Sequence, residues 1–290
     1  MKKVLIGTMM SLLVAFSVAC SSEEAGGEAE GNENGETITF GVTPWTSTVP
    51  PTEIASLILQ DMGYEVEQTS ADVGSVFVGL SRGDLDVFMD SWFPMHENYM
   101  SQYEDTINDT AVSYPEAETG WTVPTYMEDI DSIEDLKGNE DLFNNEMYGI
   151  EEGASATGES NDLIDAYDLD MTQVASSEGG MLSQAMRQMN QEEPVVFYGW
   201  RPHTMFNEHD LKVLSNEEGF FESSSVHVLT NHELKDNAPD AYEFLSNWSI
   251  SIDEVEKMIV KIEEDNEDPE DVAREWIDNN QDKVEEMIGE

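Results

Sequence analysis

The chain has 290 residues, which is long enough for two lobes of ordinary size. It carries 63 acidic and 12 basic residues, so its formal charge is -51. A surface of this sign repels nucleic-acid phosphates and anionic lipids, which excludes a nucleic-acid-binding role. The acidic residues are dispersed, without the alternating pattern of a calcium loop. We therefore expect no metal and no cofactor. We interpret the charge as a solvated coat suited to a salty environment; the alternative is an acidic patch for a metal or a basic partner.

The first residues have the pattern of an export signal. Lys2-Lys3 precede a mostly apolar segment, residues 4–18, and Cys20 follows shortly after. This pattern predicts a signal peptide over residues 1–19. It also resembles a bacterial lipoprotein signal, which implies that Cys20 becomes lipidated and N-terminal. The alternative is a plain signal peptide with an incidental cysteine. Because the chain has one cysteine, an intrachain disulfide is impossible.

Residues 20–37 combine glutamate with glycine, alanine and asparagine, and they contain little apolar mass. Such a composition predicts a disordered acidic linker that is extended by its own charge. With a lipid at Cys20, the linker would leave the globular part free near a membrane.

Short apolar runs alternate with amphipathic stretches after residue 36. Strands are predicted at residues 39–42, 64–69 and 85–89. Of the two helices between them, the first has Thr52 as a candidate N-cap and Gly63 as its stop, and the second ends near Gly83. This β-α-β-α-β order favours a parallel sheet with helices on both faces.

The same pattern recurs in the middle of the chain. Strands are predicted at residues 147–150, 194–198 and 226–230, with helices over about 160–167 and around 181–189. Two or three acidic helices follow, the last capped by Asp268. We interpret this order as two α/β lobes joined by strand crossings. Residues 38–120 and 223–290 form the predicted first lobe, and residues 121–222 form the second.

Three of the six tryptophans occur at predicted strand ends, where a loop can present an indole to a cleft. These are Trp45, Trp92 and Trp200. Indole faces attract cations, and quaternary ammonium groups suit aromatic cages best. Because ligands of such sheets bind beyond the carboxyl ends of strands, we expect the three indoles to converge on one cleft. The remaining tryptophans, Trp121, Trp248 and Trp276, are assigned to the core.

The small-residue loop at 153–158 precedes a predicted helix. Free backbone N–H groups and the positive end of a helix dipole at such a loop attract an anion. His96 is a candidate for a further hydrogen bond to a carboxylate. A cation cage together with an anion site favours a small zwitterion as the ligand.

Four segments carry a resemblance that extends over residues 38–290: Gly-Val-Thr-Pro-Trp at 41–45, the segment 78–96 that ends in Ser-Trp-Phe-Pro-Met-His, Tyr-Gly-Ile-Glu-Glu-Gly at 148–153 and Tyr-Gly-Trp-Arg-Pro-His at 198–203. On these segments the chain resembles the substrate-binding lipoproteins of glycine betaine and quaternary-amine ABC transporters. The resemblance implies an α/β, two-lobe periplasmic-binding-protein type II fold with its ligand cleft between the lobes.

The resemblance also assigns roles to residues. It implies an ammonium-binding prism of Trp45, Trp92 and Trp200, and a carboxylate site made of His96 with the backbone amides of Ser155 and Ala156. The loop reads Glu-Glu-Gly-Ala-Ser where the family pattern is Asp-Pro-Gly-Ser-Gly, which leaves the register of the two amides open.

From this resemblance we expect a non-enzymatic, monomeric binding protein anchored by lipid at the outer face of the cytoplasmic membrane. It would deliver glycine betaine to ABC permease subunits for osmoprotection. Carnitine, proline betaine and choline are alternatives, although choline lacks a carboxylate for the anion site.

Two alternatives belong to other functional classes. An extracellular hydrolase would use Asp86, Asp90 and His96, which lie close in sequence. However, the chain lacks a Gly-x-Ser-x-Gly elbow and any metal-ligand spacing. A free binding protein can also serve a sensory receptor.

Overall fold

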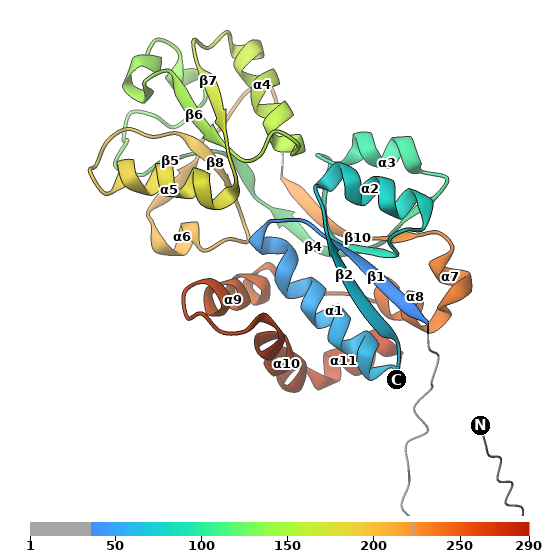
Figure 1. Ribbon diagram of the computed structural model, residues 1–290. Helices are drawn as coiled ribbons and strands as arrows, with labels where there is room; N and C mark the ends of the chain where they lie inside the picture. The colour runs from blue at the N-terminus through green and yellow to red at the C-terminus, as the bar shows by residue number, and fades with distance from the viewer. Residues whose placement is uncertain (1–35, 222, 290) are drawn as a thin grey trace, which may run out of the picture. The chain divides into compact units, whose positions relative to one another are not determined.

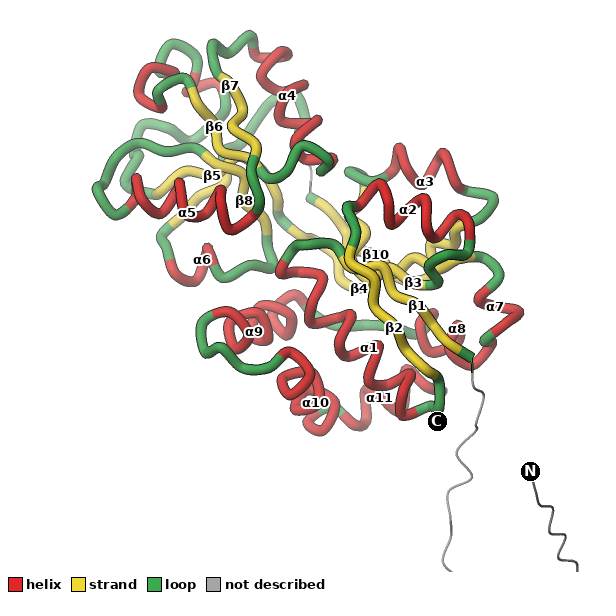
Figure 2. Tube along the Cα trace, in the orientation of Figure 1, coloured by secondary structure: helices red, strands yellow, loops and turns green. Residues whose placement is uncertain are grey.

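The computed structural model describes residues 36–221 and 223–289 (Figure 1). The predicted signal peptide, Cys20 and most of the predicted linker lie outside these residues. The described part forms two five-stranded sheets, each flanked by helices, as Figure 2 shows by secondary structure. This arrangement confirms the predicted α/β fold with two lobes. Among the described residues, no helix combines the length and apolar character needed to cross a membrane.

The first sheet has the strand order β2-β1-β3-β10-β4. Its strands are β1 (Thr37–Val42), β2 (Glu65–Ser70), β3 (Val87–Phe93), β4 (Ile107–Ala117) and β10 (Ser224–Asn231). β1 pairs in parallel with β2 and β3, whereas β10 runs antiparallel to both β3 and β4. The predicted parallel arrangement is confirmed for β1, β2 and β3, and the whole sheet is mixed because the chain leaves it after β4 and re-enters it through β10.

The helices of this sheet follow from its strand order. α1 (Val49–Asp61) connects β1 to β2, and α2 (Val73–Arg82) connects β2 back across β1 to β3. Crossovers between parallel strands are right-handed as a rule, and these two run in opposite directions, so the two helices are expected on opposite faces. Figure 1 shows α2 beside α3 (Glu97–Tyr103), on the opposite side of the sheet from α1.

Two predicted helix ends can be compared with the structure. Gly83 follows α2 with φ 74°, as expected of a C-terminal glycine in the left-handed region. The predicted N-cap Thr52 is wrong, because α1 begins at Val49 with prolines in its first turn. Proline is tolerated there because the first N–H groups of a helix have no intrahelical acceptor. The short 3₁₀ helix η1 (Thr46–Thr48) leads directly into α1.

The second sheet has the order β7-β6-β8-β5-β9. Its strands are β5 (Thr119–Pro124), β6 (Glu146–Gly149), β7 (Thr172–Ala175), β8 (Phe197–Trp200) and β9 (Leu211–Val213). α4 (Ser155–Tyr167) and α5 (Glu178–Met189) connect β6, β7 and β8 in the same way that α1 and α2 connect β1, β2 and β3. α4 begins five residues before the predicted start near 160, because the small polar residues 155–158 form its first turn and not a loop.

The remaining elements are short segments of the second lobe and the C-terminal helices. They are η2 (Glu134–Leu136), η3 (Glu140–Phe143), α6 (Met205–Glu208), α7 (Leu234–Asn237), α8 (Pro239–Ser246), α9 (Ile252–Glu263), α10 (Pro269–Asn279) and α11 (Gln281–Ile288). The prediction of two or three final helices is wrong, because five helices follow β10 in the described part of the chain. Asp268 caps α10 as predicted, accepting a hydrogen bond from the Glu270 amide. Trp121, Trp248 and Trp276 are buried, which confirms their assignment to the core.

The chain passes between the sheets twice. It enters the second sheet between Ala117 and Thr119 and returns between Val213 and Ser224. In the first sheet β1 lies between β2 and β3, and in the second sheet β6 lies between β7 and β8. The strand order therefore reverses beside β1 and beside β6. Ligands of α/β sheets bind at the carboxyl ends of strands at such a switch point. The segments that leave these points are 43–48, 92–96, 150–156 and 200–203.

Candidate functional site

The four segments meet at one pocket with about 340 Å³ of empty space. The pocket is lined by Trp45, Ser47, Trp92, Met95, His96, Ile150, Ala154, Ser155, Ala156, Tyr198 and Trp200. The structure thus brings together all six residues predicted for the ammonium and carboxylate sites.

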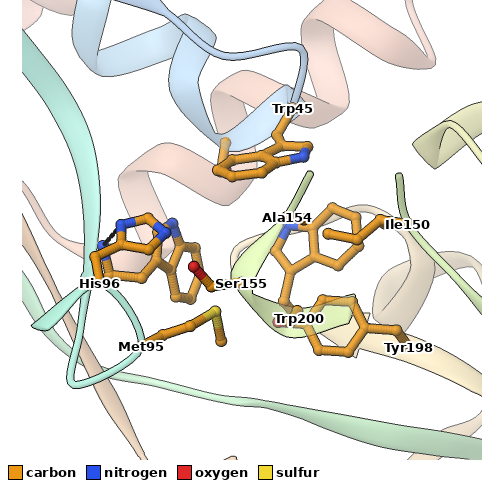
Figure 3. Close-up of a pocket in the computed structure, with 11 residues that line it drawn as sticks. Trp45, Met95, His96, Ile150, Ala154, Ser155, Tyr198 and Trp200 are labelled. Atoms are coloured by element: carbon orange, nitrogen blue, oxygen red, sulfur yellow. Dashed lines mark hydrogen bonds between the residues drawn. The ribbon is translucent and has the colours of Figure 1, made fainter. Parts of the chain in front are cut away.

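The aromatic side chains form much of the pocket wall (Figure 3). Trp45, Trp92 and Trp200 are only 7%, 5% and 4% exposed, so a cation between them would be shielded from water. Trp45 and Trp200 follow or end a strand as predicted, whereas Trp92 lies inside β3. Its side chain still faces the pocket because β3 ends only one residue later.

Tyr198 is a pocket residue that the sequence analysis did not assign. Its ring stacks on Trp200, with centroids 5.5 Å apart and an interplanar angle of 28°. The signal was present in the sequence, because residues two apart in a strand share one face. An aromatic residue two positions before a cage tryptophan in β8 is therefore expected beside it. Met95 was also missed, and it lies near His96 in Figure 3.

His96 is held as a neutral hydrogen-bond donor. Its Nδ1 accepts a hydrogen bond from the backbone N–H of Trp92 at 3.0 Å and lies 3.3 Å from the Ser91 hydroxyl. An accepting Nδ1 places the proton on Nε2. Burial lowers the pKa of His96 to about 3, so the ring is uncharged near neutral pH. The imidazole lies across the pocket from Trp200 in Figure 3, as a donor for an anionic group would.

The N-terminus of α4 provides the second set of donors. Ser155 and Ala156 are the first residues of this 13-residue helix, and both line the pocket. The N-cap Ala154 has no side-chain oxygen, and no side-chain cap hydrogen bond is formed there. The N–H groups of a first helical turn lack intrahelical acceptors and lie at the positive end of the helix dipole. This end of the pocket can therefore bind a carboxylate.

Asp90 lies behind the aromatic wall and is fully buried. Its Oδ1 accepts a hydrogen bond from Nε1 of Trp92 at 3.0 Å, and its Oδ2 accepts from the hydroxyls of Ser47 and Thr48, both at 2.8 Å. Burial raises the pKa of Asp90 to about 6, against the opposing effect of these hydrogen bonds. The carboxylate joins β3 to η1 and fixes the indole of Trp92.

Comparisons with known proteins identify the family of the chain. Residues 36–279 match the family OpuAC, described as the substrate-binding domain of ABC-type glycine betaine transport systems. The chain belongs to this family.

Two solved structures and one curated protein illustrate the similarity to the glycine betaine transport family. Lactococcal OpuAC in its closed conformation with glycine betaine is 27% identical, with a TM-score of 0.82 over 87% of this chain and 99% of that one. An ABC-transporter choline-binding protein with choline is also 27% identical, with a TM-score of 0.83 over 87% and 91% of the two chains. The glycine betaine/carnitine transport binding protein GbuC of Listeria monocytogenes is 32% identical over 146 residues. That match covers 49% of this chain and 48% of GbuC, about half the length of each.

Hydrogen bonds join the two lobes around the pocket. The Trp45 indole donates its N–H to Glu151 at 3.0 Å, and the Thr46 amide donates to Oε2 of Glu178 at 3.2 Å. Oε1 of Glu178 lies 3.0 Å from Nε2 of His203. Farther from the pocket, Arg201 contacts Glu256 of α9 through two hydrogen bonds, at 2.9 and 3.2 Å.

Two of the residues considered for hydrolysis, Asp86 and Asp90, do not share a site. Asp86 accepts a hydrogen bond from the Thr39 amide at 2.8 Å, whereas Asp90 is held by Ser47, Thr48 and Trp92. Their proximity in sequence was misleading because the two side chains have different partners at different places along β3 and the preceding loop. Among the described residues, no group of three or more His, Cys, Asp or Glu side chains could hold a metal ion.

Proposed function

We propose that this protein captures glycine betaine for an ABC importer. The observation that carries the proposal is the division of one buried pocket into two chemical halves. One half consists of Trp45, Trp92, Trp200 and Tyr198, and the other consists of the His96 ring and the N-terminus of α4. A trimethylammonium group has no N–H to donate, so aromatic faces are its best partners. A carboxylate requires donors, which the second half supplies.

The strength of the two halves can be compared. A desolvated cation–π contact contributes on the order of 2 kcal/mol per ring, so several rings together account for a large part of the affinity. A hydrogen bond from a neutral donor to a charged acceptor contributes about 1.5–3 kcal/mol. The aromatic half therefore favours any quaternary ammonium ligand, and the anion-binding half favours ligands with a carboxylate over choline.

Isothermal titration with glycine betaine, proline betaine, carnitine, choline and proline tests the proposal. We expect glycine betaine to bind most tightly and proline, whose secondary ammonium retains N–H groups, to bind weakly. Preference for choline over glycine betaine would reassign the ligand. Lack of binding by every quaternary ammonium compound would refute the aromatic-cage proposal.

The cellular setting is part of the same proposal. Lipidation of Cys20 would hold a monomeric binding protein at the outer face of the cytoplasmic membrane, where it meets the permease. Labelled palmitate should be incorporated into the wild-type protein in a bacterial host and absent from Cys20→Ala. Light scattering of the purified soluble protein should give the mass of one chain; a dimer mass would contradict the monomer.

A further inference from the structure

We propose that Asp90 is a specificity-determining residue: a buried counter-charge behind the cage that makes the pocket select a cationic head group over an uncharged group of the same shape. This inference rests on the proposed function and adds a residue that supplies charge without touching the ligand.

The position of Asp90 supports this role. It lies two residues before Trp92 in β3, so both side chains are on one face of the strand. The carboxylate accepts the hydrogen bond of the Trp92 indole at 3.0 Å, and that indole lines the pocket. The negative charge is therefore separated from a bound ammonium by a single aromatic ring.

The energetic cost of burying the Asp90 carboxylate also supports this role. A buried carboxylate is unfavourable unless it is paired or strongly hydrogen-bonded. Asp90 is 0% exposed, and three donors hold it without a cationic partner among the described residues. Hydrophobic side chains in place of this polar cluster would join β3 to η1 at a lower cost in free energy. The negative charge of Asp90 would stabilise a bound ligand cation, because charges interact strongly in a site that excludes water.

The hydrogen bond from Trp92 provides a second way in which the Asp90 carboxylate would strengthen cation binding. A carboxylate that accepts the indole N–H draws positive charge to the edge of the ring and leaves its face more negative. The face is the part that a cation contacts. Trp45 has the same type of partner in Glu151 at 3.0 Å, but Glu151 is partly exposed and its charge is screened by water. Asp90 should therefore have the larger effect of the two.

The test compares two ligands of one shape. Glycine betaine and 3,3-dimethylbutanoate share a carboxylate and three methyl groups, but the second has carbon where the first has charged nitrogen. Asp90→Asn keeps the size and an acceptor for Trp92 while removing the charge. By Coulomb's law for a nearby partly shielded charge, we expect Asp90→Asn to weaken glycine betaine binding by about 10- to 100-fold. Binding of 3,3-dimethylbutanoate should stay unchanged or improve.

Asp86→Asn is the matched control, because Asp86 accepts a backbone hydrogen bond from Thr39 away from the pocket. It should leave both affinities unchanged. Glu151→Gln should reduce the preference for glycine betaine less than Asp90→Asn does. If Asp90→Asn weakens both ligands equally, Asp90 only holds the site in shape, and if it weakens neither, the charge has no role. Failure of the wild-type protein to bind glycine betaine would instead refute the proposed function.

A measurement on the wild-type protein keeps the inference testable if Asp90→Asn does not fold. A ligand cation favours the ionised carboxylate, so glycine betaine should release protons from the protein near pH 6, whereas 3,3-dimethylbutanoate should not. Titrations in buffers of different ionisation enthalpy detect this release. Glu178 and Tyr114 interact electrostatically with Asp90, and His96 shares with it the partner Trp92. Both ligands present the same carboxylate to His96, so its contribution cancels. Equal proton release by both ligands would contradict the inference.

Discussion

Two turns of similar sequence stand on opposite sides of the pocket, and they use their histidines differently. Trp92-Phe-Pro-Met-His96 belongs to the first lobe, and Trp200-Arg-Pro-His203 belongs to the second. In both, Nδ1 accepts a backbone N–H: from Trp92 for His96, and from Met205 for His203. The shared arrangement fixes the same ring tautomer in both lobes.

The two histidines differ in the groups that lie next to Nε2. His96 presents its ring to the pocket, whereas Nε2 of His203 lies 3.0 Å from Glu178, which also accepts the Thr46 amide from the first lobe. One histidine is therefore placed to recognise the ligand, and the other supports the contact that closes the lobes. A repeated motif does not imply a repeated role, because the neighbours of the ring decide its function. The following experiments separate the two roles.

The largest effect is expected from the cage tryptophans that begin both turns. Trp92→Ala or Trp200→Ala should weaken glycine betaine binding by roughly 100-fold or more, because each removes a desolvated aromatic face from the cation. Trp276→Ala is the control, since Trp276 is a buried core residue between C-terminal helices and away from the pocket. It should lower the thermal midpoint and leave the affinity of the folded protein nearly unchanged. Normal titration of the Trp92 and Trp200 variants would exclude them from the site.

A smaller and ligand-dependent effect is expected at the first histidine. His96→Ala removes one neutral donor to the carboxylate, which should weaken glycine betaine by about 10-fold, in line with a single charge-assisted hydrogen bond. Choline has no carboxylate, so its affinity should change much less. The ratio of the two dissociation constants is the diagnostic quantity. Equal loss for both ligands would mean that His96 supports the pocket without recognising the carboxylate.

The second histidine should affect all ligands equally. Glu178→Gln or His203→Ala weakens a contact between the two lobes. We predict that the lobes close around the ligand, so the binding-competent state should become less populated and apparent affinity should fall by a few-fold. The glycine betaine to choline ratio should remain that of the wild type. Small-angle scattering should show weaker compaction at a fixed subsaturating ligand concentration. A changed ratio would place Glu178 or His203 in ligand recognition.

The pH dependence of stability should distinguish a His96 variant from the wild-type protein. Burial lowers the folded-state pKa of His96 to about 3, below its ordinary value of 6.5. Between these values the unfolded chain binds a proton that the folded state excludes, so this residue makes stability fall as pH decreases from about 6.5 towards 3. His96→Gln should remove that part of the slope in urea unfolding curves. Identical slopes for variant and wild type would show that folding does not lower the pKa of His96.

The sequence analysis predicted the α/β two-lobe fold, and it named six residues that lie together in the structure. Trp45, Trp92, Trp200, His96, Ser155 and Ala156 all line one pocket, because strand ends and turns at a switch point are marked by Trp, Pro and Gly in the chain. Strand direction was harder to predict. β10 is antiparallel because it returns from the second lobe, and no local pattern in residues 224–231 encodes that path.

Sequence patterns also did not predict hydrogen bonds between side chains that are far apart in the chain. Glu178 begins a helix, and its charge alone is typical of a first helical turn. Its contacts with Thr46 and His203 exist only in the folded chain. Asp90 accepts hydrogen bonds from two elements, η1 and β3. These elements are far apart in the sequence, since Ser47 and Asp90 are separated by 43 positions. Sequence reasoning therefore predicted residues that line the pocket and missed those that hold them in place.

The smallest expected effect is that of salt on ligand affinity, and it contrasts the pocket with the acidic surface. At a formal charge of -51, like charges repel one another in the folded protein, and the Debye length shrinks from ~10 Å at 0.1 M to ~3 Å at 1 M salt. Molar NaCl should therefore raise the thermal midpoint. Affinity should change by no more than about two-fold, because the zwitterion has no net charge to be steered and the buried cage excludes counter-ions. Melting curves and titrations at both salt concentrations measure the two responses separately. Loss of affinity by orders of magnitude in a folded protein would mean that exposed carboxylates bind the ammonium and that the indoles are not its main partners.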